Sequence, residues 1–585
     1  MALDAICLMA VKEELRGRII GMKVDKVRQP ERDIIILSLR GGDAPPCNLL
    51  ISSGTGDARL HLTEYKFENP GSPPMFCMLL RKHITGARIT DITQPPAERV
   101  LDLALEAKDA MGLVSEKHLI VELIGRSSNI ILTDDGGMII GCVRHNGGEP
   151  FGKRYVLPGL IYHPPPTQQG KQDPLSVSAE KWRELFSQHS EKQIDAWLLA
   201  NFAALSPLIC REILWRAYGE LDLLVNRVND GGEALCTAFF TLMEQAGSGK
   251  FEPWMIIDFD NSPRDFSYTR ITQYESSLDI RRYESFSKLL DEYYTRSAQI
   301  LRQSQRAAAT SRTVSTARDR LIRKLSLQRE ELNNTNNRDW YRECGDIIMA
   351  NLHLMKKGHS VLRAEDFYSE DGGWREIALD TRKSPKQNAE KYYKDYSKAK
   401  NALKFLSEQI QLGESELEYL SSVLEEIKLT DSESGLSEIR SELMRTGYIK
   451  SQKSAKDKPV ESEPTRFESS TGMRIFAGRN NTQNDKLTLK AAARSDIWLH
   501  AQKSHGAHVI ISCDGEPPDA ASLNEAASIA AYYSSARDSG KTPVDYTLVK
   551  HVKRRPGGRP GMVIYTDYKT IIATPDEELV SRLKK

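Results

Sequence analysis

The feature that most constrains the fold is a seven-residue repeat of apolar side chains between residues 392 and 427. Spacings of three and four residues alternate, and the members are Tyr392, Tyr396, Ala399, Leu403, Leu406, Ile410, Gly413, Leu417, Leu420, Leu424 and Ile427. This pattern, sustained over about five heptads, predicts a long helix whose apolar seam packs against another helix. We therefore expect an extended helical arm in addition to compact domains.

A weaker strip upstream offers a partner for that seam. Its members recur every seven residues and are Tyr293, Ile300, Ala307, Val314 and Leu321. The economical prediction is an antiparallel coiled-coil arm over residues 271–430 that folds back on itself, with a small middle domain at about 334–388 between its helices. A parallel dimer, in which the two strips pair between chains, is the alternative.

The region before the arm is expected to mix strands and helices. Apolar runs at 33–39, 48–53, 118–124, 129–135 and 138–144 are separated by GGD, DDGG and NGG, a pattern typical of strands joined by turns. The triple proline of RYVLPGLIYHPPP cannot continue regular structure, so an α+β domain is predicted over residues 1–175.

Residues 176–270 change to helical periodicity. Within them FAALSPLICREI has the proportions of a helix–hairpin–helix, with Ser206-Pro207 opening the second helix. An ordinary helical bundle is the alternative, because the glycine usual in that hairpin is absent.

After the arm, residues 431–467 are rich in Lys, Ser, Glu and Pro without periodicity, which predicts a linker. Residues 468–576 combine short strands with the alanine-rich helix LNEAASIAAYYSSAR and predict a compact α+β domain, followed by a tail at 577–585. The fold class expected for the whole chain is thus α+β and multidomain.

Composition narrows the function classes. A chain of 585 residues is too long for one core, and its 81 Lys and Arg nearly cancel its 80 Asp and Glu. Any nucleic-acid binding must therefore come from local basic patches.

The eight cysteines form no CxxC pair, which argues against a disulfide framework or a thiolate zinc site and fits a reducing cytoplasm. The N-terminus carries Asp4, Glu13 and Glu14 in place of a signal peptide, and no run is long enough for a membrane span.

The sharpest local signal is RSDIWLHAQKSHGAHVII, residues 494–511. It holds Asp496, Trp498, His500, His505 and His508. Nothing here supplies a recognisable set of three or four metal ligands, so no metal is expected. Two readings stay open: histidines that pack a strand edge, and a recognition surface in which His500 and Trp498 contact a nucleotide or a peptide.

Two further stretches favour recognition of RNA. The strand and Gly/Pro loop of YTLVKHVKRRPGGRPGMVIY carry no acid among Lys550, Lys553, Arg554, Arg555 and Arg559. Such a cationic loop suits phosphates. GRNNTQND adds Arg479, Asn480, Asn481 and Gln483, which suit ribose, phosphate or base edges. A solvated loop and an ordinary turn are the alternatives for these two stretches.

Motifs of covalent chemistry are missing from the sequence. It contains no phosphate-binding P-loop, no GxGxxG between a strand and a helix, no HExxH and no GxSxG. We therefore expect neither an enzyme nor a bound cofactor.

Several blocks, in the same order, give the chain a resemblance to a known family. They are MALDA, LLRKHITGARITDITQ, VELIGRSSNIILTD, GDIIMANLHL, LDTRKSPKQNAEKYYKDYSKAK, GRNNTQNDKLTLKAA, DIWLHA, HGAHVII, VDYTLVKHVK and PGMVIY. With them the chain resembles the NFACT family of ribosome quality control proteins, of the bacterial RqcH type. The resemblance implies an N-terminal domain like that of formamidopyrimidine-DNA glycosylases, a helix–hairpin–helix, a coiled-coil arm with a middle domain and a C-terminal RNA-binding domain.

The resemblance also implies a function. Such proteins bind large ribosomal subunits obstructed by peptidyl-tRNA, contacting ribosomal RNA and the stalk base. They recruit alanyl-tRNA and promote untemplated addition of alanines to the stalled chain, while the ribosome's peptidyl-transferase centre makes the bonds. Glycosylase action on DNA is not expected, because Ala2-Leu3 stands where those enzymes carry a catalytic proline and glutamate. A fibronectin-binding surface adhesin, after the family's older name, and a scaffold that binds only proteins are the alternatives.

The family's functional residues map onto particular positions of this chain. Members need an Asp in the N-terminal motif and an Asp-Arg pair for tRNA recruitment, which correspond here to Asp4 and to Glu98-Arg99, with an acid one methylene longer. In the last domain Gly506-Ala507-His508 replaces the usual Gly-Ser-His. The RNA-binding residues expected there are Arg479, Asn480, Asn481, Asp496, Trp498, His500, His508, Lys550, Lys553, Arg554 and Arg555.

Overall fold

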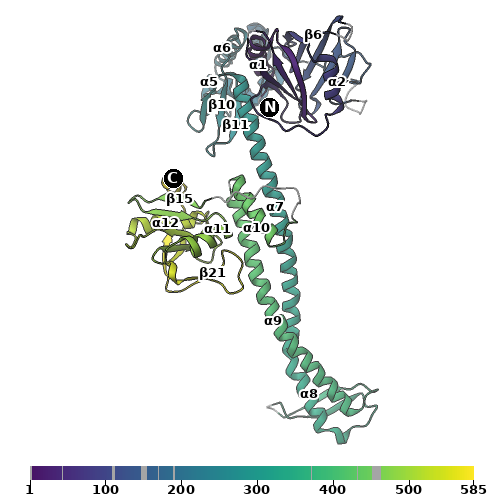
Figure 1. Ribbon diagram of the computed structural model, residues 1–585, viewed down its shortest axis with the longest axis vertical. Helices are drawn as coiled ribbons and strands as arrows, with labels where there is room; N and C mark the ends of the chain where they lie inside the picture. The colour runs from purple at the N-terminus through teal and green to yellow at the C-terminus, as the bar shows by residue number, and fades with distance from the viewer. Residues whose placement is uncertain are drawn as a thin grey trace. The chain divides into compact units, whose positions relative to one another are not determined.

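A computed structural model describes residues 3–42, 44–108, 112–146, 154–168, 170–188, 191–369, 372–430, 432–450 and 463–585, except for the side chain of Asn336 (Figure 1). Ala2, most of the NGG turn at 146–148, and residues 431 and 451–462 of the predicted linker lie outside the described residues. The chain forms two compact units, residues 1–301 and 302–585.

The first unit is built on an antiparallel sheet of nine described strands in the order β4-β3-β2-β1-β5-β6-β7-β8-β9. The strands are β1 (Lys23–Glu31), β2 (Ile34–Arg40), β3 (Cys47–Ser52), β4 (Arg59–Leu62), β5 (Arg88–Thr93), β6 (Val100–Lys108), β7 (Val114–Glu122), β8 (Asn129–Asp134) and β9 (Ile139–Cys142). The five strands predicted from apolar runs are β2, β3, β7, β8 and β9, and all five are confirmed.

Two helices pack on this sheet, α1 (Ala5–Ile19) and α2 (Met75–Ile84). Apolar residues occupy most of α1, and Ile6, Leu8, Val11 and Leu15 are all buried in the core that it shares with the strands. Burial of each such side chain contributes about 1.5–3 kcal/mol. Helix α1 is thus fixed firmly, and so is the residue that caps its N-terminus.

A helical layer follows, formed by α3 (Ala179–Phe186), α4 (Ile194–Asn201), α5 (Pro207–Tyr218) and α6 (Glu233–Gly247). Its core is aromatic: Trp182 stacks on Phe186 at 5.2 Å and meets Trp197 edge-on at 5.5 Å. As predicted, Ser206 is the N-cap of α5 and Pro207 its first residue. A small sheet of β10 (Trp254–Ile257), β11 (Pro263–Ser267) and β12 (Asp279–Arg282), which the sequence analysis did not predict, completes the unit.

Helix α7 (Phe286–Asn334) starts inside the first unit and continues into the second. Its first turn is held by Glu14, whose carboxylate accepts hydrogen bonds from the amides of Phe286 (2.6 Å) and Ser287 (3.0 Å). An acid at this point satisfies amides that have no partner within the helix and complements the helix dipole.

In the second unit α7 runs antiparallel to α9 (Pro385–Leu429) (Figure 1). Arg329 of α7 pairs with Glu414 of α9 at 2.6 Å, and Arg306 pairs with Glu433, which follows the C-terminal end of α9, so residue numbers rise along α7 as they fall along α9. Gly413 lets the helices approach closely, since a Cβ there would lie 2.7 Å from Leu325 Cδ2. The two apolar strips thus meet within one chain, not between two chains.

The segment between α7 and α9 holds α8 (Arg338–Ala350) and the hairpin of β13 (Val361–Asp366) and β14 (Gly373–Ala378). They enclose a small core with Cys344, Ile347 and Ile377, which accounts for the insert in the heptad pattern.

Part of the segment predicted as a linker is ordered instead as α10 (Glu433–Arg445), whose Ile439 and Leu443 pack against α9.

The C-terminal domain has a six-stranded sheet in the order β15-β16-β18-β17-β19-β22 and a separate hairpin β20–β21. Its elements are β15 (Thr465–Glu468), β16 (Arg474–Ala477), α11 (Asn481–Lys486), β17 (Ile497–Ala501), β18 (Val509–Ile511), α12 (Ala520–Tyr532), β19 (Thr542–Leu548), β20 (Val552–Arg554), β21 (Val563–Tyr565), β22 (Lys569–Ala573) and α13 (Glu577–Leu583). The mixed α+β, multidomain fold class is confirmed. None of the described helices combines the length and the apolar character that a bilayer crossing requires.

Candidate nucleic-acid interface

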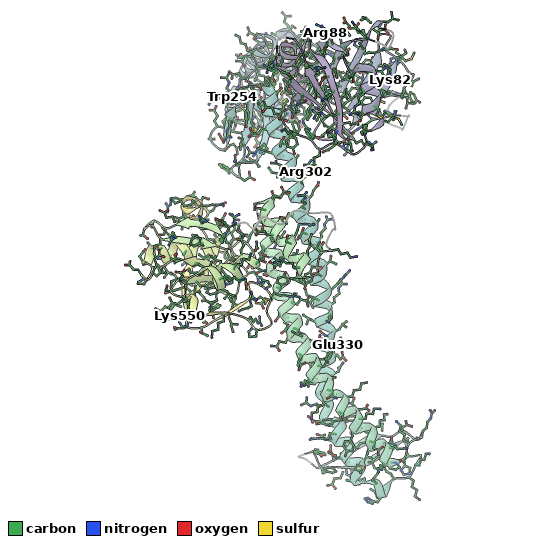
Figure 2. All side chains as sticks on the ribbon, in the orientation of Figure 1. Lys82, Arg88, Trp254, Arg302, Glu330 and Lys550 are labelled. Atoms are coloured by element: carbon green, nitrogen blue, oxygen red, sulfur yellow. The ribbon has the colours of Figure 1, made fainter. Side chains whose placement is uncertain are left out.

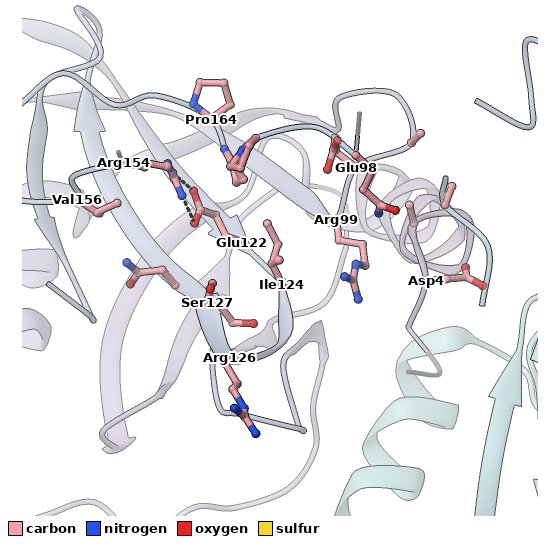
Figure 3. Close-up of a pocket in the computed structure, with 18 of the residues that line it drawn as sticks. Asp4, Glu98, Arg99, Glu122, Ile124, Arg126, Ser127, Arg154, Val156 and Pro164 are labelled. Atoms are coloured by element: carbon pink, nitrogen blue, oxygen red, sulfur yellow. Dashed lines mark hydrogen bonds and ion pairs between the residues drawn. The ribbon is translucent and has the colours of Figure 1, made fainter. Parts of the chain in front are cut away.

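A pocket of about 900 Å³ in the first unit brings together the three residues predicted for tRNA recruitment, Asp4, Glu98 and Arg99 (Figure 3). Asp4 precedes α1, whereas Glu98 and Arg99 lie in the turn between β5 and β6, so the sequence separates residues that the sheet places side by side. In the close-up Arg99 lies between Asp4 and Ile124. Four arginines line the pocket: Arg99, Arg126, Arg144 and Arg154.

Hydrogen bonds lock the two segments together. The Asp4 carboxylate caps α1 by accepting from the Cys7 amide at 2.8 Å. The side-chain amide of Gln94 donates to the carbonyl of Ala5 in α1 and to the carbonyl of Glu98 in the turn, both at 2.9 Å. One side chain therefore sets the position of Glu98-Arg99 relative to Asp4.

Two strained residues border the same pocket. Ala97 has φ +57° and Ala204 has φ +63°, values in the left-handed region that side chains with a Cβ rarely adopt. Ala204 lies in the hairpin before α5, so an alanine there adopts a conformation that usually favours glycine. Strain of this kind tends to collect at functional sites, where the surrounding structure maintains it.

Burial controls the charges at this end of the pocket. It raises the pKa of the Asp4 carboxyl from 3.8 to about 6, against the opposing effects of the Cys7 amide, Ser206 and Arg99. Burial also raises the pKa of Glu98, which Arg99 opposes, and lowers the pKa of Arg99, which Asp4 and Glu98 oppose. A guanidinium flanked by two acids in a concave, partly dry site can grip a phosphate or a base edge with directed hydrogen bonds.

The opposite wall of the pocket holds residues for which the sequence analysis predicted no role. The Glu122 carboxylate accepts from the two terminal nitrogens of Arg154, one at 3.0 Å, and from the Tyr162 hydroxyl at 2.9 Å (Figure 3). Arg126, in the loop after β7, is exposed and lines the pocket. In the sequence, Glu122 and Arg126 lie in the block VELIGRSS, which contributed to the family resemblance, and Arg154 and Tyr162 lie in RYVLPGLIYHPPP, where only the prolines were interpreted.

The raised pKa of Asp4 predicts a pH dependence of stability. The folded state holds this proton more tightly than the unfolded chain, so the favourable contribution is complete below about pH 4 and is lost as the pH rises through 6. Between pH 7.5 and pH 5 the free energy of unfolding of the parent is expected to gain about 1 kcal/mol relative to Asp4→Asn. Urea unfolding at both pH values measures this difference.

Glu13→Gln is the matched control for that experiment, because it removes a half-exposed acid from the same helix. It is expected to leave the pH dependence of the parent unchanged. Equal pH profiles for the parent and Asp4→Asn would contradict the burial of a titrating carboxyl at this position.

In the C-terminal domain, the buried Trp498 and His508 cluster with His500 and Tyr565, which are partly exposed. Trp498 is 0% exposed, stacks on His500 at 5.7 Å and meets His508 edge-on at 5.3 Å. Burial lowers the pKa of His500 to about 4 and that of His508 well below its ordinary value, so both imidazoles are neutral at pH 7. Buried, uncharged rings stabilise the domain and offer little to a phosphate, so a direct RNA contact by Trp498, His500 and His508 stays a prediction.

Asp496 is likewise structural, since its carboxylate accepts from the amides of Ala493 (2.8 Å) and Cys513 (3.0 Å). Asn480 and Asn481 are also buried, at 1% and 6% exposure. Neither amide is exposed in this conformation, so direct contact of Asn480, Asn481 and Asp496 with RNA stays a prediction. Among described residues, no group of three or more His, Cys, Asp or Glu side chains could hold a metal.

The predicted basic residues divide into two sets. Arg554 pairs with the buried Asp485, and Arg555 pairs with Glu418 at 2.8 Å. Lys550 and Lys553 are exposed on the domain surface, with Lys550 marked in Figure 2. Arg479 is exposed as well, although its Nε donates to Thr465 at 2.8 Å. The two lysines are therefore the predicted residues best placed for phosphate contacts.

Family comparison covers nearly the whole chain. The model of the NFACT N-terminal and middle domains matches residues 4–462, and the model of the NFACT protein RNA binding domain matches residues 464–565. The chain belongs to the NFACT family. The expected resemblance is confirmed, and the domain that carries Lys550 and Lys553 is the NFACT RNA-binding domain.

Relatives of this NFACT chain extend over its full length. The Rqc2 homolog RqcH of Bacillus subtilis (strain 168) is 35% identical over 589 residues, and that of Streptococcus suis (strain 05ZYH33) is 32% identical over 589 residues, each with 100% of both chains covered. Among solved structures, the fibrinogen binding protein from Staphylococcus aureus shows 28% identity and a TM-score of 0.42, covering 50% of this chain and 99% of that chain.

Proposed function

We propose that this NFACT protein is a cytoplasmic ribosome quality control factor. It binds large ribosomal subunits obstructed by peptidyl-tRNA, recruits alanyl-tRNA and promotes untemplated addition of alanines to the C-terminus of the stalled chain, which marks the chain for degradation. The peptidyl-transferase centre of the ribosome makes the peptide bonds, so the protein itself acts as a binding and positioning factor.

The observation that carries the proposal is the pocket of the first unit. It gathers Asp4, Glu98 and Arg99, the residues that correspond to the family's tRNA-recruitment positions, from segments more than ninety residues apart. The chain is similar to proteins named Rqc2 homolog RqcH over 100% of both chains. This similarity supports assigning the role in tRNA recruitment to the same positions of this chain. Lys550 and Lys553 add phosphate contacts from the RNA-binding domain.

Association with large subunits that carry peptidyl-tRNA is expected to depend strongly on salt. Neutralising phosphates releases counterions, so about four such contacts predict a loss of affinity of about 100-fold between 50 and 200 mM salt. Co-sedimentation across this range measures the effect, and sequencing of the co-purified tRNA identifies the species recruited.

The double variant Lys550→Gln/Lys553→Gln should reduce the slope of log affinity against log salt concentration. Lys541→Gln, which changes an exposed lysine preceding β19, serves as the control.

Two outcomes would contradict the proposal. One is binding that stays unchanged between low and high salt, because the contacts would then not involve phosphates. The other is release of the protein by a protease applied to intact cells, without lysis, which would favour the surface adhesin.

A further inference from the structure

Within the second unit, the N-cap and first turn of α11 (Asn481–Lys486) are bonded to the helices of the arm instead of being open to solvent. The side-chain amides of Asn480 and Gln483 both donate to one Glu438 oxygen of α10, at 2.6 and 2.9 Å. The Asn481 amide donates to Ser422 of α9 at 2.9 Å. The GRNNTQND motif thus contacts both α9 and α10 through its side chains.

Backbone groups of the same turn add to the contact. Burial raises the pKa of the Glu426 and Glu442 carboxyls, and the backbone amides of Asn481 and Thr482 oppose that rise, so each amide faces one of the two carboxyls. The Thr482 hydroxyl donates to Glu442 as well, at 2.5 Å. Both amides therefore report directly on whether the RNA-binding domain is docked on the arm.

A second loop of the domain, residues 555–562, rests on the same helices. Arg555 pairs with Glu418 of α9 at 2.8 Å, the Arg559 guanidinium lies 5.6 Å from the centre of the Tyr419 ring, and Met562 packs against the apolar core of the arm. Gly561 lets this loop approach the first turn of α11 closely, since a Cβ at position 561 would lie 2.5 Å from Asn481 Oδ1. The loops therefore dock together.

The chemistry of this contact resembles that of an RNA contact. On the arm side it presents carboxylates, and on the domain side it presents arginines, side-chain amides and backbone N–H groups. Those are the donors that proteins direct at phosphate oxygens, and a carboxylate satisfies them in the same way. We define the acidic docking face as Glu418, Glu426, Glu438 and Glu442.

We propose that the acidic docking face is an internal competitor of RNA. It holds the RNA-binding domain through residues 480–483 and 555–562, and phosphates that take over the arginine and side-chain amide donors release the domain from the arm, which opens the backbone amides of Asn481 and Thr482 to water. The inference rests on the proposed function, because it requires that the chain binds RNA. Exposed pairs such as Arg555–Glu418 are individually weak, which suits a contact that opens and closes.

Hydrogen exchange of single amides in the full-length chain tests the release. Saturating in vitro transcribed tRNA is expected to raise the exchange rates of the Asn481 and Thr482 amides about tenfold. The Asn484 amide is the internal control, because it donates to the Asn480 carbonyl at 2.8 Å within the same turn and should keep its rate.

A pair of variants tests the competition. Glu418→Gln removes the partner of Arg555 and is expected to raise affinity for the tRNA about threefold. Glu414→Gln removes the same charge from α9 one turn away, but Glu414 pairs with Arg329 of α7, so affinity should stay at the parental value. The comparison separates relief of a specific contact from a general loss of negative charge.

The outcomes separate the two proposals. A chain that binds large subunits and tRNA but whose Asn481 and Thr482 amides keep their rates overturns the internal competitor alone, as do equal affinities of the two variants. A chain that binds no RNA in dilute buffer overturns the proposed function and the competitor together.

Discussion

An Arg99→Ala variant is expected to lose alanine tailing while keeping most of its binding to large subunits. Arg99 lies between Asp4 and Ile124 in a partly buried site, and truncation leaves two acids in the pocket without their cation (Figure 3). Removing one member of a desolvated, charge-assisted contact costs about 2–5 kcal/mol, which predicts a loss of tRNA affinity of about 30-fold or more. Mass spectrometry of the stalled chain measures the tails, and co-sedimentation measures subunit binding.

Arg88→Ala is the matched control for this result, because Arg88 is an exposed arginine of the same sheet that does not line the pocket. It removes an equal charge and should leave the tails intact. Tails of parental length from Arg99→Ala would contradict the assignment of the pocket.

Glu98→Asp, which restores the shorter acid, tests whether the acid's length affects recruitment, with tail length as the readout.

The heptad repeat predicted α9 well, because a seam that packs against one neighbour imposes a regular period. It did not predict α10, since that helix packs against a second stripe of α9 that includes Tyr419 and Val423, both fully buried. The upstream strip extended too far: Ile300 is 46% exposed, so pairing of the strips starts near Ala307. A heptad repeat predicts which residues form the apolar seam. Where the pairing of the seam begins depends on which other helix packs against it in the folded chain.

The candidate site was predicted unevenly for a similar reason. Asp4, Glu98 and Arg99 came from the resemblance, and only the sheet could show that Gln94 fixes their relative positions. Polar side chains in a motif such as GRNNTQND look the same in sequence whether they face a ligand or another part of the chain. Burial distinguishes the two cases, and burial is a tertiary property.

A Trp498→Ala variant is expected to destabilise the RNA-binding domain by about 3–5 kcal/mol, the usual cost of truncating a large buried aromatic residue. Trp498 is 0% exposed and packs against His500, His508 and Tyr565, so its loss leaves a cavity under the β17 strand. Chemical unfolding of the full chain, followed by a probe in the C-terminal domain, measures the change. If Trp498 instead contacted RNA, the variant would lose affinity with little change in stability.

Trp498→Phe separates packing from recognition more finely. It retains an aromatic ring but removes the indole N–H, a buried donor that has no hydrogen-bond partner among the described residues. Such an unsatisfied donor costs about 1–3 kcal/mol, which offsets part of the area lost with the smaller ring. We expect Trp498→Phe to cost less than half as much stability as Trp498→Ala and to bind tRNA as the parent does. A selective loss of tRNA binding in a stable Trp498→Phe protein would instead show that Trp498 contacts RNA.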